Sequence, residues 1–271
     1  MPGSTSRASC SPGWDWRATR EGSQLPAASV NNQAAAGVPP PAPGSMRYFV
    51  LLYTPAPRRR ALATLLAVAD ELGSGLQRRL DHGIAHLRLE WWREEAVRDA
   101  GGTPTHPWLI ALRAEGEPAL PLRALAEAAV LDLASATLGG DGARQLPQAC
   151  LLGAARLLCA GGLTADDAAR LVQLGTWIDA LDAVGPGSGA QTLPRAPAVP
   201  TPALQPALAP LLVWGALARV LAGRRLRRGC GGSGTMSPSA WDGMADNFTA
   251  WRAARRALHG RFSFEADPAH E

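Results

Sequence analysis

The sequence predicts an all-α protein, folded as a single helical bundle behind a disordered N-terminal leader. Apolar residues recur every three or four positions in almost every segment after residue 55, the spacing that places them on one face of a helix. Prolines begin these segments and glycines end them. The chain is 46% hydrophobic and 18% charged, which lies within the range of globular proteins.

The first 45 residues are rich in Ser, Ala, Pro and Gly and show neither helical nor strand periodicity. Segments of this composition bury too little apolar surface to offset the entropy lost on ordering. We therefore expect 1–45 to be a disordered leader and 46–271 to be the helical domain. Met46 begins the first segment with a foldable pattern, so we hypothesise that translation starts there, and mass spectrometry of the native N-terminus tests this. Residues 48–54 alone have strand composition, and one strand cannot form a sheet.

Four helices are predicted in the first half of the domain from their start and stop signals. Pro55 and Pro57 begin the first, Asp81 can cap the second, and Pro107 begins a short third. The fourth follows residue 121 and ends at the glycines 139–140. The stripes expected to face inward are Leu62, Leu65, Leu66, Ala69 and Leu72; Ile84, Leu87, Trp91 and Val97; and Leu122, Leu125, Ala129 and Leu133.

Four further helices are predicted in the second half. One begins at Pro147, and one begins at Thr164, where Asp167 takes the place of Glu in a capping box. A third spans 210–228, apolar first and basic last, and a fourth follows Ser237 and Pro238. The expected inward stripes are Leu151, Ala154 and Leu158; Leu171, Leu174, Ile178 and Leu181; and Trp241, Met244, Phe248, Trp251 and Leu258.

The basic residues exclude several kinds of chemistry. All 27 are Arg, so lysine Schiff bases, pyridoxal phosphate held on lysine and a Walker-A phosphate loop are excluded. Arginine clusters at 58–60, 78–79 and 224–228 suit phosphate groups or solvated helix ends, and no sequence-specific nucleic-acid module accompanies them. We expect no specific nucleic acid as a partner. The basic end of 210–228 predicts salt-sensitive, peripheral contact with anionic membranes.

The cysteines and the hydropathy pattern predict the compartment. Cysteines at 10, 150, 159 and 230 form no CxxC pair, so reduced thiols and a cytoplasmic setting are expected. No signal-peptide pattern begins the chain, and its longest apolar run, 206–218, is too short to span a bilayer. We expect a cytoplasmic protein with peripheral contact on the inner membrane face.

Three groups of residues are candidates for chemistry. Asp179 and Asp182, three positions apart on one predicted helix, could jointly bind Mg²⁺, with Asp70 and Glu71 completing the site if their helices are antiparallel neighbours. The alternative is a solvated acidic face.

Two further groups are weaker candidates. His82, His86 and Glu90 share a helix face that could bind zinc or simply be solvated. The tryptophans could line an apolar cavity or belong to an ordinary core.

From Met46 onward the chain resembles the squalene/phytoene synthase family. Arg47, Tyr48 and Phe49 are similar to the family's opening segment, and residues 65–72 are similar to the stretch around its first acidic motif. The most specific match is residues 87–95, which contain Trp91, Trp92 and Arg93, followed by the pair 106–107. The resemblance implies an all-α isoprenoid-synthase bundle that joins two prenyl diphosphates head to head with Mg²⁺ as cofactor.

The resemblance also implies site residues and two functional classes. It implies substrate contacts at Tyr48, Glu71 and Trp91, and metal contacts at Asp179 and Asp182. The aspartates of the first acidic motif would fall on positions 73 and 77, which are Gly and Gln, so the catalytic carry-over fails there and no catalytic residue is assigned. The chain is then a prenyltransferase with a depleted metal site, or a protein of this fold, similar to mitochondrial complex I assembly factors, that binds an isoprenoid or a protein partner without catalysis.

Overall fold

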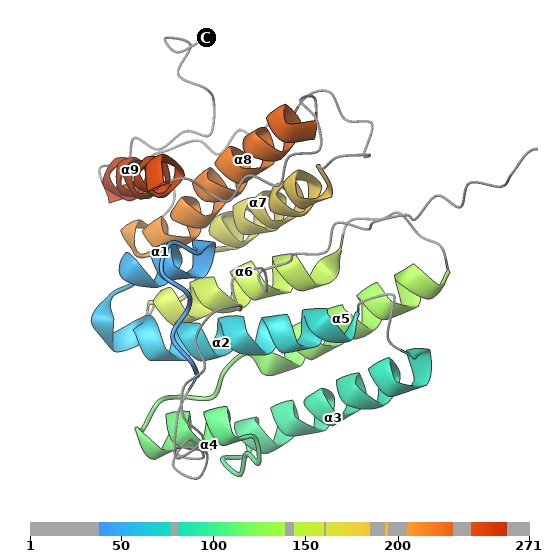
Figure 1. Ribbon diagram of the computed structural model, residues 1–271. Helices are drawn as coiled ribbons and strands as arrows, with labels where there is room; N and C mark the ends of the chain where they lie inside the picture. Colours follow the sequence, from blue (N-terminus) through green and yellow to red (C-terminus); the bar gives the residue numbers. More distant parts are fainter. Residues whose placement is uncertain are drawn as a thin grey trace, which may run out of the picture.

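The chain is helical throughout the part that the structure describes. The computed structural model describes residues 38–76, 81–138, 144–159, 161–184, 193–194, 205–229 and 240–258. These ranges contain nine α-helices, one short 3₁₀ segment and no strand, which confirms the predicted all-α class (Figure 1). The helices are α1 (Met46–Leu52), α2 (Ala56–Gly75), α3 (His82–Ala100), α4 (Pro107–Ala114), α5 (Leu122–Thr137), α6 (Gln145–Leu158), α7 (Ala165–Ala183), α8 (Ala209–Gly229) and α9 (Ala240–Leu258), with the 3₁₀ segment at Pro206–Leu208.

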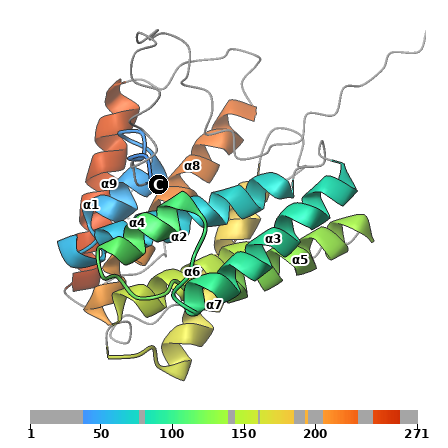
Figure 2. The same cartoon turned by 90° about the horizontal axis from the view of Figure 1, so that it is seen from below.

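The helices pack as a continuous bundle with α6 near its middle. α6 packs against α2, α5 and α7, while α8 packs against α1, α7 and α9. α3 packs on α5 at one edge of the bundle and α9 packs on α8 at the opposite edge, as the two views show (Figures 1 and 2). Because α6 lies between α2 and α7, the acids of α2 do not face those of α7 across one helix–helix contact.

Two predicted N-caps are confirmed, and one helix begins earlier than predicted. The Asp81 carboxylate accepts hydrogen bonds from the first turn of α3, and the Thr164 hydroxyl accepts one from the backbone of Asp167 in α7. α6 begins at Gln145, two residues before Pro147. The reason is tertiary: the carboxylate of Asp132 on α5 accepts hydrogen bonds from the backbone N–H groups of Gln145 and Leu146, at 2.6 and 3.0 Å.

Residues 48–54 have strand composition but form no strand, because most of them belong to α1. The Ser45 hydroxyl caps this helix by accepting from the Tyr48 backbone N–H at 3.2 Å. Phe49 and Val50 are each 1% exposed, so burial on the bundle outweighs the weak helical propensity of aromatic and β-branched residues.

The inward face predicted for α3 is also wrong. Ile84, Leu87 and Val97 are 59%, 70% and 66% exposed. The face that is buried consists instead of Ala85, Leu89, Trp92, Glu95, Ala96 and Asp99. The carboxylates of the two acids on this face, Glu95 and Asp99, accept hydrogen bonds from the chain that follows α3. Because these hydrogen bonds offset the cost of burying the carboxylates, this face can turn inward.

The predicted inward stripe of α9 is wrong where its side chains are described. Phe248 and Trp251 are 55% and 44% exposed, whereas the buried positions are Ala250, Ala253, Ala254 and Ala257. Small side chains allow α9 to approach α8 closely, and this approach turns the aromatic residues outward. The stripes predicted for α2, α6 and α7 are buried in the core, except for Ala69 of α2, which is partly buried.

Several predictions fall wholly or partly outside the described residues. These are most of the leader, 1–37, the glycines 139–140, the arginines 78–79 and the cap at 237–238. In the ranges that are described, none of the helices combines the length and the apolar content needed to cross a bilayer.

Candidate functional site

Charged and aromatic side chains from α2, from α3 and from the start of α4 come together, and we call this the α2–α3–α4 junction. Glu71 of α2 pairs with Arg88 of α3, with 3.2 Å between carboxylate Oε1 and guanidinium Nη2. The Arg88 side chain is 39% exposed and that of Glu71 is 34% exposed, so the pair remains accessible to solvent. Trp91 follows Arg88 by three residues on the same helix, the spacing that places two side chains on one face.

An aromatic cluster continues the junction from α3 to α4. Trp91 and Trp92 meet edge to face at 5.1 Å between ring centroids, and the His106 ring lies 6.0 Å from Trp91 and 5.0 Å from Trp92. Trp108 lies 4.8 Å from His106. Trp92 is 1% exposed and anchors the cluster in the core, whereas Trp91 is 39% exposed and presents its ring at the surface.

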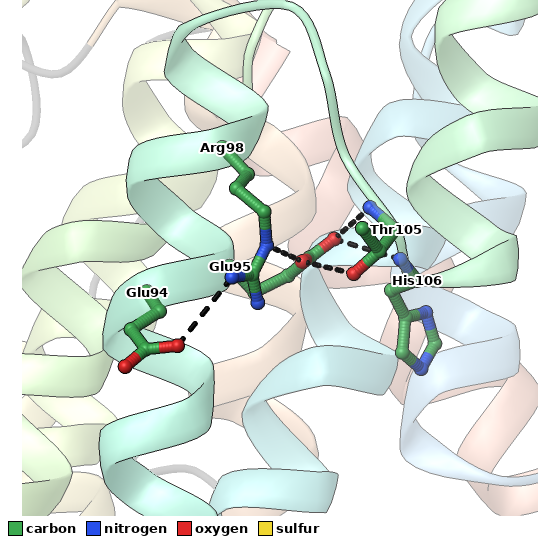
Figure 3. Close-up of polar contacts among 5 residues, drawn as sticks. All are labelled: Glu94, Glu95, Arg98, Thr105 and His106. Atoms are coloured by element: carbon green, nitrogen blue, oxygen red, sulfur yellow. Dashed lines mark hydrogen bonds and ion pairs between the residues drawn. The ribbon is translucent and has the colours of Figure 1, made fainter.

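Glu95 fixes the chain that enters α4 (Figure 3). Its carboxylate is fully buried and accepts four short hydrogen bonds. The donors are the backbone N–H groups of Thr105 and His106, each at 2.7 Å, the Thr105 hydroxyl at 2.6 Å and the Arg98 Nε at 2.7 Å. Burial alone would raise the pKa of Glu95, but these hydrogen bonds outweigh it and hold the pKa below its ordinary value.

His106 is a neutral imidazole at the start of α4. Its Nδ1 accepts from the Trp108 backbone N–H at 3.3 Å and thereby caps the helix, so we assign the ring proton to Nε2. Burial lowers the pKa of His106, while the charges of Glu71 and Glu95 raise it by a smaller amount. The ring therefore offers an N–H donor without a positive charge near pH 7.

Asp99, one turn after Glu95 on α3, similarly binds α4 and the chain that leads into α5. Its carboxylate accepts from Arg113 Nε at 2.9 Å and from the Leu120 backbone N–H at 3.0 Å.

Sequence reasoning missed Glu95, His106 and Asp99 as site or scaffold residues. The available signal was the spacing of Glu95, Asp99 and Trp92 on one helical face, which would have placed two acids beside a buried tryptophan.

Of the three predicted substrate-binding residues, the structure brings two together. Glu71 and Trp91 both belong to the junction, through Arg88 and His106. Tyr48 lies on α1, which packs against α2 and α8, and its half-buried ring meets Phe49 edge to face at 5.5 Å. The neighbouring Arg47 forms an ion pair with Asp70, the residue before Glu71. Burial raises the pKa of Asp70, and the Arg47 charge opposes that rise.

The two aspartates predicted to bind Mg²⁺ each lie beside an arginine. Asp179 accepts from the Arg144 backbone N–H at 3.0 Å and from Arg144 Nε at 2.5 Å. Asp182 lies 3.7 Å from a guanidinium nitrogen of Arg225 on α8. With Asp132, Asp179 therefore stabilises the start of α6, where the free backbone N–H groups of the helix favour negative charge.

The described residues do not form a complete metal-binding site. Among the described ranges, no group of three or more His, Cys, Asp or Glu side chains is placed to hold a metal ion, and this applies to His82, His86 and Glu90 as well. Glu90 pairs with Arg93 at 2.9 Å. Two carboxylates engaged by arginine donors supply too few oxygen ligands for Mg²⁺. The Mg²⁺ cofactor thus stays a prediction.

Comparison with known proteins assigns no function to this site. No family model matches the chain, and no curated protein or solved structure matches it.

Proposed function

We propose that this chain is a squalene/phytoene synthase-type bundle that binds an isoprenoid diphosphate without condensing it. The observation that carries the proposal is the α2–α3–α4 junction, where Glu71 pairs with Arg88 and Trp91 lies beside His106. The all-helical fold supports the proposal, because it is the class that the sequence resemblance implies.

The junction offers two kinds of contact for such a ligand. Arg88 can exchange the Glu71 carboxylate for a diphosphate, because a guanidinium binds carboxylate and phosphate with the same planar set of donors. The half-exposed ring of Trp91, held in place by the buried Trp92, provides an aromatic surface against which a hydrocarbon chain can pack. The neutral His106 adds a donor for a phosphate oxygen.

The acidic residues favour binding over catalysis. Head-to-head condensation ionises a carbon–diphosphate bond, and the charge that develops on the leaving group has to be neutralised. The acids that would anchor a neutralising metal are engaged elsewhere: Asp70 by Arg47, and Asp179 by Arg144. They also lie on α2 and α7, with α6 between them. A carboxylate in such an ion pair would have to lose its partner before it could serve as a ligand.

Calorimetric titration of the full chain with farnesyl diphosphate tests the proposal. Wild type is expected to bind, and Arg88→Gln is expected to weaken binding at least tenfold, since charge-assisted hydrogen bonds contribute about 1.5–3 kcal/mol. Arg93→Gln is the matched control, because Arg93 lies on the same helix but pairs with Glu90. Absence of binding by wild type, or equal affinity in the two variants, would refute the proposal.

A second function, as an assembly or scaffold protein, is favoured by one observation. Ile84 and Leu87 are 59% and 70% exposed and lie on the face of α3 that also presents Trp91. Exposed apolar patches of this kind mark protein–protein interfaces. If assembly is the function, Leu87→Glu will abolish co-migration of the tagged chain with its complex in host extracts while farnesyl diphosphate binding persists. Leu131→Glu, at a position on α5 that is 59% exposed, is the control.

A further inference from the structure

The outward face of α9 carries large aromatic side chains, while its inward face carries alanines. Phe248 and Trp251 are 55% and 44% exposed, and their rings stack with 5.7 Å between centroids. The buried positions are Ala250, Ala253, Ala254 and Ala257. This arrangement inverts the usual amphipathic helix, in which the larger apolar residues face the core.

Arginines of the same helix lie over these rings. The Arg252 Cζ is 5.5 Å from the centre of the Phe248 ring, and the Arg255 Cζ is 5.3 Å from the centre of the Trp251 ring. These distances are within the range of cation–π contacts. The outward face of α9 is therefore an apolar platform flanked by guanidinium groups, and long arginine side chains can hold their charge at a polar boundary while apolar neighbours are buried.

The charge on this helix favours an anionic partner. α9 contains three arginines, all in its second half, and two acids, Asp242 and Asp246, in its first half. Asp246 pairs with Arg224 of α8 at 2.8 Å, and both side chains are 14% exposed, so the acid is turned toward the bundle. Arg255 is exposed on the outward face.

We propose that α9 docks this protein on the surface of an anionic lipid bilayer. Phe248 and Trp251 would enter the boundary between headgroups and acyl chains, and Arg255 would contact lipid phosphates. α9 lies at the edge of the bundle, where a flat partner can reach it (Figures 1 and 2). The helix would then lie parallel to the surface, because the side of α9 that carries the aromatic residues is the side that enters the boundary.

A bilayer fits this face better than a nucleic acid does. Proteins that bind single strands stack successive bases on separate aromatic faces along a basic groove. Here the faces of Phe248 and Trp251 are covered by each other and by Arg252 and Arg255. Both side chains nevertheless stay partly exposed, so their apolar surface is available to a bilayer. This inference does not rest on the proposed binding of an isoprenoid diphosphate.

Co-sedimentation of the full chain with vesicles tests the inference. We expect binding to vesicles of phosphatidylcholine mixed with phosphatidylglycerol, little binding to phosphatidylcholine alone, and weaker binding at high salt. Arg255→Gln is expected to lower the partition coefficient about fivefold, which corresponds to about 1 kcal/mol for one arginine near an anionic surface. Trp251→Ala is expected to lower it by at least as much.

Two control variants and three contrary outcomes make the test decisive. Leu131→Ala and Arg123→Gln alter exposed side chains on α5 and are expected to leave vesicle binding unchanged. Circular dichroism will confirm that the α9 variants stay folded, since the alanine face is unaltered. Equal binding to neutral vesicles, or equal binding by Trp251→Ala and wild type, would overturn the inference. Tighter binding to a single-stranded oligonucleotide that both α9 variants weaken would also overturn it, and would assign the face to nucleic acid.

Discussion

The backbone N–H of His106 donates a 2.7 Å hydrogen bond to the buried carboxylate of Glu95, and this contact fixes the start of α4 against α3 (Figure 3). The same carboxylate also accepts hydrogen bonds from Thr105 and Arg98, so each of its two oxygens accepts two hydrogen bonds. A buried charge is costly unless it is paired and hydrogen-bonded, and Glu95 meets both conditions. The position of the His106 ring among the tryptophans therefore depends on a residue that does not touch solvent.

Glu95→Gln is expected to destabilise the protein by about 2–4 kcal/mol, because it removes a buried charge and turns an amide donor toward backbone N–H groups. Chemical denaturation followed by circular dichroism measures this change. Glu94→Gln is the matched control, since the Glu94 side chain is 69% exposed and bonds Arg98 at 3.4 Å. Equal stability of the two variants would show that the Glu95 contacts contribute little.

His106 is expected to make stability depend on pH in a defined window. Its folded pKa is lowered, mainly by burial, so the unfolded chain binds more protons than the folded chain below the ordinary histidine pKa of about 6.5. The stabilisation is complete above that value and is lost as the pH falls through the lowered folded pKa. Unfolding free energies measured on both sides of the window will show this slope. His106→Asn, which can still cap α4, should flatten it, and an NMR titration placing the pKa at or above 6.5 would contradict the prediction.

Asp132 is expected to contribute to stability through the start of α6. It accepts from Gln145 and Leu146, and its pKa is raised by burial although these hydrogen bonds and the Arg144 charge oppose the rise. Asp132→Ala should cost about 1–2 kcal/mol, the range for a lost N-cap. Asp132→Asn should cost less, because the amide keeps one acceptor oxygen. Thermal unfolding measures both, with the exposed Asp166→Ala as control; a loss no greater than that of the control would refute the role.

Cys150 is expected to be unreactive in the folded protein. Burial raises the pKa of its thiol to about 12, so the thiolate is scarce at neutral pH. Treatment of the native protein with iodoacetamide near pH 8, followed by peptide mass spectrometry, should leave Cys150 unmodified, whereas treatment in denaturant should label it completely. Rapid labelling of Cys150 in the native state would mean that α6 opens readily.

Helix boundaries could be predicted where the signal is local. The caps at Asp81 and Thr164 involve residues within a few positions of each other, and both are confirmed. The start of α6 could not be predicted, because its cap comes from Asp132 on another helix. α1 was missed because its aromatic and β-branched residues have strand composition.

The inward faces of α3 and α9 could not be predicted from hydrophobicity alone. α3 has two competing stripes, and the one with larger aliphatic residues, Ile84 and Leu87, is exposed. The buried stripe contains Glu95 and Asp99, whose partners lie in the following loop and α4. In α9 the buried side chains are alanines, which contribute little to a hydrophobic pattern. The Glu71–Arg88 pair, likewise, joins two helices across a distance in sequence that no local spacing encodes.

The basic end of α8 also differs from its expected role. Arg224 and Arg225, which the sequence assigned to anionic membranes, lie in ion pairs with Asp246 and Asp182. Their charge is used to join α8 to α9 and to α7. Peripheral membrane contact stays a proposal, and the proposal now concerns the outward face of α9.

The most direct test of isoprenoid binding without condensation is incubation of the full chain with radiolabelled farnesyl diphosphate and Mg²⁺, followed by separate counting of protein-bound label and of organic-soluble C30 product. We expect label retained by the wild-type protein, less retained by Arg88→Gln, and no C30 product. Formation of that product would contradict the loss of catalysis, most directly if Asp179→Ala or Asp182→Ala abolished it. A wild-type protein that retained no label would contradict the binding itself.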